Sequence, residues 1–264
     1  LYDNALLLRA YALAYVRTGS QRHAHTARAI AAWARREMML QASAGEVAFF
    51  SSLDADSDGG EGRFYLWSEG DLQAALPDAD ARWAARVFGI AAPGAVEGAD
   101  VPYLASPPEG LAVGGNPAAD AAKERLADVR ARMLAAREKR PRPATDDKVL
   151  TSWNGLMLAG LADAGRLLHD DAMVELARAN AAFLRARVWQ GGRLLHMWKD
   201  GEARVEGLLE DYAYLGLGLL ALHRATLDEE PLAWALALAD AVRERFHDDA
   251  SGGYFSTASD AEPL

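Results

Sequence analysis

The sequence predicts a mainly α-helical fold, in which helical hairpins repeat and curve around a common axis as an incomplete (α/α) toroid. Apolar residues recur with helical spacing through most of the 264 residues. The segment ARAIAAW at 27–33 returns as ARANAAF at 177–183 and as ALALADA at 235–241, and the helix before each copy follows the same offsets. Such a repeat indicates stacked hairpins. A short β-like stretch after each hairpin favours a toroid over an open solenoid.

The elements follow in order from these patterns. The predicted helical hairpins cover about residues 2–42, 68–139, 146–188 and 208–247. Within the first hairpin, helices are expected over 5–18 and 22–41, separated by Gly19. Residues 47–67 read as a β-hairpin with strands at 47–53 and 63–67 around an acidic tip. Short strands are also expected at 193–198 and 253–256.

The remaining stretches complete the predicted architecture. Residues 89–116 are rich in proline and glycine and are expected to form a long loop insertion. The helices that begin near residues 5, 155 and 213 are rich in small residues, which suits a crowded inner ring. We treat residues 1–264 as one partial toroid domain, because about four hairpins fall short of a six-hairpin ring. The chain begins with Leu1 rather than Met, so we expect it to be a fragment.

Composition excludes several classes of function. Lys and Arg number 28 against 38 Asp and Glu, and the net charge of −10 disfavours nucleic-acid binding. The chain has no cysteine, which excludes disulfides, thiolate catalysis and Cys-ligated metals. No apolar run approaches 18 residues, so no membrane span is expected and we expect a cytoplasmic location.

Parallel inner helices would bring their starting turns to one end of the domain, where carboxylates, an amide and aromatic rings would surround a depression. Such groups suit a polar ligand rich in hydroxyls, such as a sugar or another polyol. The candidate acid and base residues are Asp54, Asp56, Asp147 and Asp211. The candidate substrate-binding residues are Asp3, Asn4, Glu61, Lys148, Trp153, Asn154 and Tyr212.

Simpler structural roles exist for the same residues. Acidic residues at helix starts can be N-caps, and Trp153 and Tyr212 can be core aromatics. His196 is a lone histidine on a predicted strand, and proton transfer would need a second positioned group.

A calcium loop is an alternative for the acidic tip. Asp54, Asp56, Asp58 and Gly59 match positions 1, 3, 5 and 6 of such a loop, whereas position 12 is Tyr65. Glu61 would then be the substitute ligand. Otherwise the tip is an acidic turn, and no other cofactor or metal is expected.

Five motifs together resemble one family. They are LYDNALL at 1–7, FFSSLDADSDGGEGRFYLW at 49–67, RPRPATDDKVLTSWNGLM at 140–157, LLEDYAYL at 208–215 and GGYFST at 252–257. The chain is similar to the spermatogenesis-associated protein 20-like proteins, whose bacterial members are described as thioredoxin-domain-containing. The resemblance implies a thioredoxin-like domain ahead of an (α/α)6 toroid similar to six-hairpin glycosidases and N-acylglucosamine 2-epimerases. Residues 94–98 depart from an Asn-Phe-Glu-Gly element of that family, and the acidic tip holds fewer glutamates.

Two functions remain open at the level of sequence. The leading hypothesis is a domain that processes or binds carbohydrate, either glycosidase-like or sugar epimerase-like. The alternative is a non-catalytic structural or interaction scaffold that partners a thioredoxin-like domain. An enzyme of the glycosidase type should place two carboxylates in one cleft, roughly 5–9.5 Å apart. A scaffold should hold them singly in caps and salt bridges.

Overall fold

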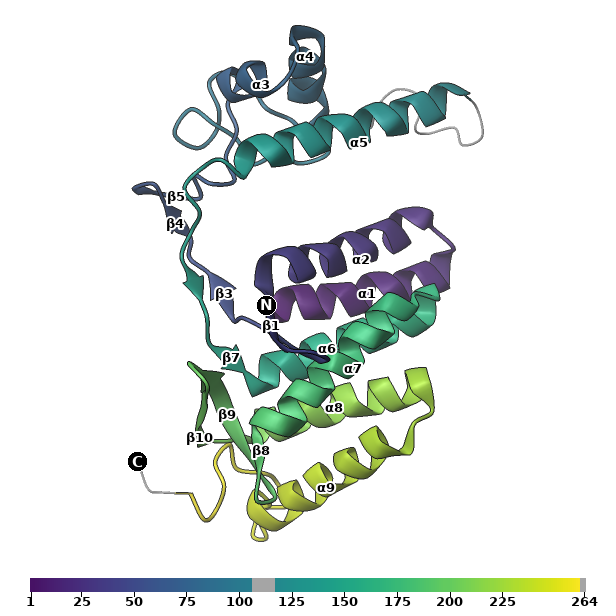
Figure 1. Cartoon of the computed structure of the whole chain (residues 1–264), viewed down its shortest axis with the longest axis vertical. Helices are drawn as coiled ribbons and strands as arrows, with labels where there is room; N and C mark the ends of the chain where they lie inside the picture. Colours follow the sequence, from purple (N-terminus) through teal and green to yellow (C-terminus); the bar gives the residue numbers. More distant parts are fainter. Residues whose placement is uncertain (106–116, 262–264) are drawn as a thin grey trace. The chain divides into compact units, whose positions relative to one another are not determined.

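The computed structural model describes residues 1–105 and 117–261 (Figure 1). The chain divides into two compact units, which are described separately below. Unit 1 comprises Leu1–Ser52 and Thr145–Leu264, and unit 2 comprises Leu53–Ala144. Helices dominate the described residues, so the predicted mainly α-helical class is confirmed. Closure into a ring, the number of hairpins in it and the assignment of one partial domain stay predictions.

Unit 1 contains three antiparallel helical hairpins (Figure 1). Their helices are α1 (Tyr2–Thr18) with α2 (Gln21–Trp33), α6 (Thr151–Leu168) with α7 (Asp171–Arg187), and α8 (Leu209–Thr226) with α9 (Glu229–Arg245). The first helix of each pair ends on a residue in the left-handed conformation, which turns the chain back at once. These residues are Gly19, His169 and Leu227, with φ of 68°, 52° and 61°.

The helices α1, α6 and α8 lie side by side and run in the same direction. A Cβ atom at Gly160 of α6 would come within 2.7 Å of the Ala5 carbonyl oxygen in α1. A Cβ atom at Gly155 would come within 2.5 Å of the Leu215 amide nitrogen in α8. Because early residues of α6 meet early residues of α8, the starts of these helices lie at the same end of unit 1.

Short strands surround this end of the helices. β1 (Met39–Ser43) pairs antiparallel with β2 (Glu46–Phe49), after a π-helical turn over Ala34–Met38. β9 (Arg193–Lys199) pairs antiparallel with β10 (Glu202–Glu206), β8 (Trp189–Gln190) and β7 (Val149–Leu150). Since β7 runs directly into α6, the side chains of β9 lie next to the start of that helix. β3 (Ser52–Leu53) and β6 (Thr145–Asp146) stand where the chain passes between the units.

Unit 2 has a core of its own. It contains β4 (Asp56–Ser57), β5 (Gly60–Glu61), α3 (Glu69–Ala75), α4 (Asp78–Val87) and α5 (Pro117–Arg137). Trp67, Leu72, Phe88 and Met133 are among the buried side chains that hold these helices together. Ser68 and Asp71 cap the start of α3 reciprocally, through bonds between each side chain and the other's backbone amide.

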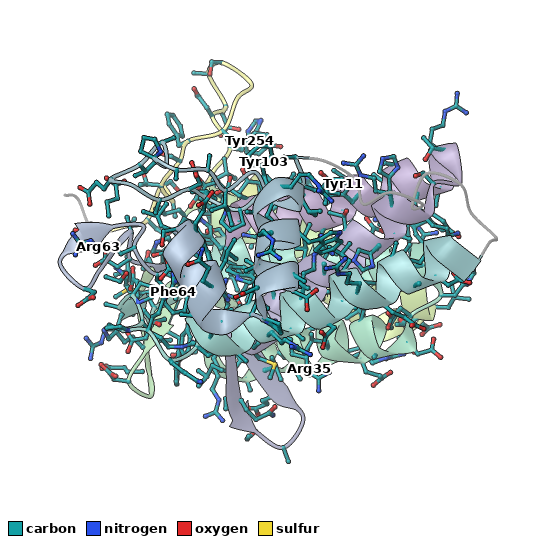
Figure 2. The ribbon with its side chains drawn as sticks, turned by 90° about the horizontal axis from the view of Figure 1, so that it is seen from above. Tyr11, Arg35, Arg63, Phe64, Tyr103 and Tyr254 are labelled. Carbon is teal, nitrogen blue, oxygen red and sulfur yellow. The ribbon has the colours of Figure 1, made fainter. Side chains whose placement is uncertain are left out.

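Several predicted boundaries are wrong. Residues 47–67 do not form one β-hairpin, because residues 47–49 pair back onto β1 and only β4 and β5 pair within the acidic tip. The predicted strand at 63–67 is instead a turn that starts at Gly62, where φ is 70° and the Tyr65 amide donates to the Gly62 carbonyl. Arg63 and Phe64 lie next to each other in this turn (Figure 2).

Three further corrections concern the ends of elements. The second α-helix ends at Trp33 and continues as the π-helical turn to Met38, after which residues 39–43 pair with β2 across the turn at Gly45 instead of extending the helix to residue 41. The helical stretch at 68–88 divides at Pro77, which cannot donate a helical hydrogen bond. The predicted strand at 253–256 is reduced to one bridge, between Tyr254 and His247.

Residues 89–105 of the predicted loop insertion form no named helix or strand, and residues 106–116 lie outside the described residues. Within the described part of the chain, no helix has the length and apolarity needed to cross a bilayer.

Candidate functional site

A histidine and a buried aspartate meet where β9 passes the start of α8. His196 Nδ1 lies 2.8 Å from Asp211 Oδ2. Asp211 is completely buried, and the side chain of His196 is 23% exposed. His196 lies on the same face of β9 as the buried Leu194 and as Trp198, which packs edge-on against Phe183. This shared face turns the histidine toward the helices.

Backbone amides from two elements fix Asp211 in place. Its Oδ1 accepts from the Ser152 amide at the start of α6, at 2.9 Å, and its Oδ2 accepts from the Leu208 amide, at 2.8 Å. These amides are unpaired donors of helix starts, and they favour a negative charge on the acceptor. Asp211 therefore joins α6 to α8 and holds the imidazole in one orientation.

The charge of this site favours a protonated His196. The hydrogen bond with Asp211 raises the pKa of His196 above its ordinary value; burial opposes this, and the negative charges of Asp211 and Glu210 add to it. An ionised carboxylate only accepts, so Nδ1 carries a proton and Nε2 is the atom that can take up or release one. A histidine oriented in this way by a buried carboxylate has the arrangement of a general acid or base.

Glu210 adds a second, exposed carboxylate. It accepts a hydrogen bond from the Ser152 hydroxyl at 3.3 Å. Candidate ligand atoms of His196, Glu210 and Asp211 all lie within 4.8 Å of one another, the one such metal-competent group found among the described residues. Both oxygens of Asp211 already accept hydrogen bonds, so the geometry suits proton transfer better than metal coordination.

Aromatic rings lie at the starts of α1 and α6. Tyr2 is 41% exposed, and its ring centre lies 4.8 Å from that of the half-buried Trp153, with the planes tilted by 57°. Trp153 directly follows Ser152, whose backbone and hydroxyl contact Asp211 and Glu210. The predicted residues Asp3 and Asn4 occupy the first turn of α1, where Asp3 is exposed and Asn4 is half-buried.

The predicted charged residues ahead of α6 form ion pairs. Lys148 Nζ lies 3.1 Å from Asp146 Oδ2, and Lys199 Nζ lies 2.6 Å from Asp147 Oδ1. The second pair joins the segment just before β7 to the end of β9. Asp147 is thus held by a lysine that we did not predict as its partner.

Two of the predicted ligand-binding residues belong to the interior. Asn154 is fully buried, and its amide group bonds the Phe49 amide, the Phe49 carbonyl and the Leu150 carbonyl, each at 2.9 Å. Tyr212 is 1% exposed, and its hydroxyl accepts from the Leu194 amide and from Arg245. Their polar groups are satisfied inside the protein, so we correct both assignments to structural roles.

Asp54, Asp56 and Glu61 lie in unit 2, where they are exposed. Asp54 accepts from the backbone amide of Asp56 at 3.1 Å, as expected of an acidic turn. Among the residues that the structure describes, Asp54, Asp56 and Asp58 are not a group whose ligand atoms converge as a metal site requires. The tip therefore gives no support to the calcium alternative.

The sequence relatives cover nearly all of the chain. The human protein named spermatogenesis-associated protein 20 is 30% identical over 297 residues, which span 99% of this chain and 37% of the relative. The mouse and rat proteins of that name are each 29% identical over the same shares. The chain is a homologue of spermatogenesis-associated protein 20. This agrees with the family resemblance of the five motifs. The chain spans little more than a third of the length of these relatives, and no protein-family model matches it.

Two solved structures are distantly similar to this chain. A sugar epimerase from a ruminal bacterium is 12% identical, with a TM-score of 0.42 over 100% of this chain and 64% of the other. A D-mannose isomerase is 13% identical, with a TM-score of 0.37 over 96% of this chain and 77% of the other. Likeness at this level supports no inference about function, so the site is interpreted from its own geometry.

The sequence analysis named both Asp211 and His196 but missed that they pair with each other. The two residues come from a strand and a helix, 15 positions apart, and nothing in that spacing indicates contact. The two-residue spacing of Leu194, His196 and Trp198 was a usable signal, because it places the histidine on the same face of its strand as an apolar core residue. Glu210 was also missed as a site residue, although it precedes Asp211 in the same turn.

Proposed function

We propose that unit 1 binds a sugar or a related polyol at the starts of α6 and α8, and moves a proton on it with His196. The observation that carries this proposal is the 2.8 Å contact between His196 and the buried Asp211. A carboxylate placed behind an imidazole fixes its tautomer and stabilises its charged form. An oriented histidine of raised pKa can exchange protons near neutral pH.

The surroundings of the histidine support a ligand rich in hydroxyls. Glu210 offers an exposed carboxylate that can accept hydroxyl hydrogen bonds beside the imidazole. The rings of Tyr2 and Trp153 provide apolar faces at the neighbouring helix starts. The carboxylates can bind the hydroxyl groups of a sugar, and the aromatic rings can stack on the apolar faces of its ring.

Of the two reaction types expected from the sequence, epimerase-like or isomerase-like chemistry fits the residues better than glycoside hydrolysis. Hydrolysis needs two carboxyl groups that face the substrate across a cleft. Asp211 is fully buried, and its oxygens are occupied by two amides and the imidazole. Epimerisation or isomerisation instead needs removal and return of a proton on carbon beside a carbonyl, which a histidine can perform.

The test is deuterium exchange. We would incubate the chain with single aldoses and ketoses in D2O and follow loss of the C2 or C1 proton signal by NMR. The wild type should exchange one of these protons, and the His196→Gln variant should lose the exchange by about 10²-fold or more. His247→Gln is the matched control, because His247 also pairs with an aspartate, Asp249 at 2.9 Å, in an exposed position.

The result that contradicts the proposal is a wild type that neither exchanges protons nor binds any of these sugars in calorimetry. Equal exchange by the wild type and His196→Gln would place the chemistry elsewhere.

A scaffold that partners a thioredoxin-like domain is the second candidate. It is favoured by the pairing of Asp146 and Asp147 with lysines and by the structural role of Asn154. The observation that the chain covers 37% of its human relative leaves room for such a domain in the whole protein. A co-purification experiment with the full-length protein's remaining segments tests it, and absence of stable association would contradict it.

A further inference from the structure

Three arginines converge on one buried aspartate, away from the histidine site. Asp163 lies in the second half of α6, and Arg9 of α1 donates from Nε to its Oδ2 at 2.8 Å. Arg166 of α6 and Arg224 of α8 each place an Nη2 atom near Asp163 Oδ1, at 3.6 and 3.5 Å. All three parallel helices thus contribute a cation to one place on unit 1.

The aspartate lies beneath and the arginines reach solvent. The side chain of Asp163 is 5% exposed, whereas those of Arg9, Arg166 and Arg224 are 34%, 40% and 46% exposed. Within the described residues, Asp163 Oδ1 is buried and has no hydrogen-bond partner. Arg166 and Arg224 are therefore close enough for charge attraction, but their N–H groups are not donated to this oxygen.

The charge of this cluster is unbalanced. One carboxylate faces three guanidinium groups, so about two positive charges remain in excess. Other arginines of unit 1 meet at least as many carboxylates: Arg187 pairs with Glu46 at 2.8 Å, and Arg193 and Arg245 share Glu206 and Asp260. A local excess of positive charge is notable in a chain whose net charge is −10.

We propose that Arg9, Arg166 and Arg224 form a binding site for a phosphoryl group, either as inorganic phosphate or as a phosphomonoester. Planar guanidinium forks match the oxygen atoms of phosphate and bond them in pairs. The three free oxygens of a phosphoryl group equal the three arginines in number, whereas a carboxylate has only two. Asp163 holds the forks together from below. This site is independent of the polyol proposal.

A purely structural role would have different requirements. Arg166 and Arg224 lie in the last turns of α6 and α8, where a positive charge stabilises the carbonyl ends of the helix. A lysine supplies that charge as well as an arginine does, but it lacks the fork. Replacement of both arginines by lysine therefore separates binding of phosphate from stabilisation of the helices.

The experiment measures binding of inorganic phosphate by calorimetry and by thermal unfolding, at constant ionic strength set with NaCl. The wild-type 264-residue chain should bind phosphate saturably, with a rise in Tm. The double variant Arg166→Lys/Arg224→Lys should keep its ligand-free Tm within about 2 °C and bind phosphate at least about tenfold more weakly. Arg243→Lys is the matched control, because Arg243 is an exposed helical arginine paired only with Asp240 among the described residues.

Arg9→Lys provides the same test on another helix, and it decides the outcome if the double variant does not fold. Glycerol 3-phosphate in place of phosphate distinguishes the two sources: tighter binding indicates an organic phosphate, and equal binding indicates inorganic phosphate. The proposal is overturned if phosphate raises the Tm no more than chloride does, or if Arg9→Lys and the double variant bind phosphate like the wild type.

Discussion

Asp211 performs three tasks at once. It accepts from the Leu208 amide at the start of its own helix, receives the Ser152 amide of the neighbouring helix and orients His196. An aspartate that favours a helix start by its charge alone can stay at the surface, as Asp3 does in the first turn of α1. Complete burial of Asp211 is possible because each of its oxygens meets donors. This makes the pair of Asp211 and His196 sensitive to protonation.

The first prediction concerns pH. The hydrogen bond with Asp211 raises the pKa of folded His196 above its unfolded value of about 6.5, so protonation favours the folded state. The wild type should exceed His196→Gln in stability below pH 6.5, by about 1.5 kcal/mol, the lower end for a bond to an ionised group. This advantage should shrink as the pH rises through the raised pKa, because the neutral imidazole keeps its Nδ1–H bond to Asp211 but loses the attraction between opposite charges.

Urea unfolding of both proteins from pH 5 to 9 provides the measurement. His247→Gln should change stability by only a few tenths of a kcal/mol at any pH, because its pair with Asp249 is exposed. A stability difference between the wild type and His196→Gln that grows with pH would contradict the inferred charge of the pair.

Sequence reasoning located the helix starts of the site better than it assigned their side chains. Asp211 and Tyr212 were selected together, yet the aspartate binds the histidine and the tyrosine enters the core against Phe246. Adjacent positions on a helix point in directions about 100° apart, so a motif of consecutive residues does not share one role. Asn154 was selected for its polarity, but its contacts with Phe49, 105 residues earlier, are set by tertiary structure.

At the scale of elements, α6 and α8 approach each other so closely that only glycine fits. A Cβ atom at Gly155 would meet the backbone of Tyr214 and Leu215 at 2.5–2.6 Å, and one at Gly218 would meet the Gly155 carbonyl oxygen at 2.6 Å. By contrast, nothing lies within 4 Å of a Cβ atom at Gly216. The close packing predicted for these glycine-rich helices is therefore present between α6 and α8, although not at every glycine.

The second prediction compares two alanine substitutions in these helices. Gly155→Ala should lower the free energy of unfolding by about 1–3 kcal/mol or more, because backbone atoms must separate to admit the methyl group. Gly216→Ala should raise it by about 0.5–1 kcal/mol, because alanine reduces the entropy lost on helix formation without a clash. Chemical unfolding of both variants measures these free energies. Equal changes in the two variants would contradict the close contact at Gly155.

The repeat in the sequence predicted the hairpins of unit 1 because helix pairs with the same packing need similar residues at the same offsets. The β segments were predicted less well. Residues 63–67 alternate poorly between buried and exposed positions, since Phe64, Leu66 and Trp67 are all buried. Which strand pairs with residues 47–49 depends on the turn at Gly45, and a run of apolar residues does not encode that choice.

At the scale of the whole molecule, unit 2 is an insertion into the chain of unit 1. The two chain segments that lead to it are already joined inside unit 1, where the Ser51 amide donates to the Asp146 carbonyl at 3.2 Å. Unit 2 has its own buried cluster around Trp67 and Phe88. The fold of unit 1 should therefore not require unit 2.

The third prediction is that unit 1 folds after unit 2 is removed. Residues 53–144 would be replaced by Asn-Gly, which forms the tight turn preferred between antiparallel neighbours. We expect the shortened chain to keep the far-UV circular dichroism of its helices and to unfold in one cooperative thermal transition. The same linker in a chain carrying Gly155→Ala is the control, and its Tm should be lower. A non-cooperative melt of the shortened chain itself would contradict the independence of unit 1.

The glycine contact between α6 and α8 also constrains movement. Two helices in backbone contact at Gly155 and Gly218 cannot slide or rotate past each other without losing that contact. Ser152 of α6 anchors Asp211 of α8, so the two helices must move together as one rigid body. Ligand encounter at His196 should accordingly follow lock-and-key kinetics: a single bimolecular phase, without a slower rearrangement of these two helices.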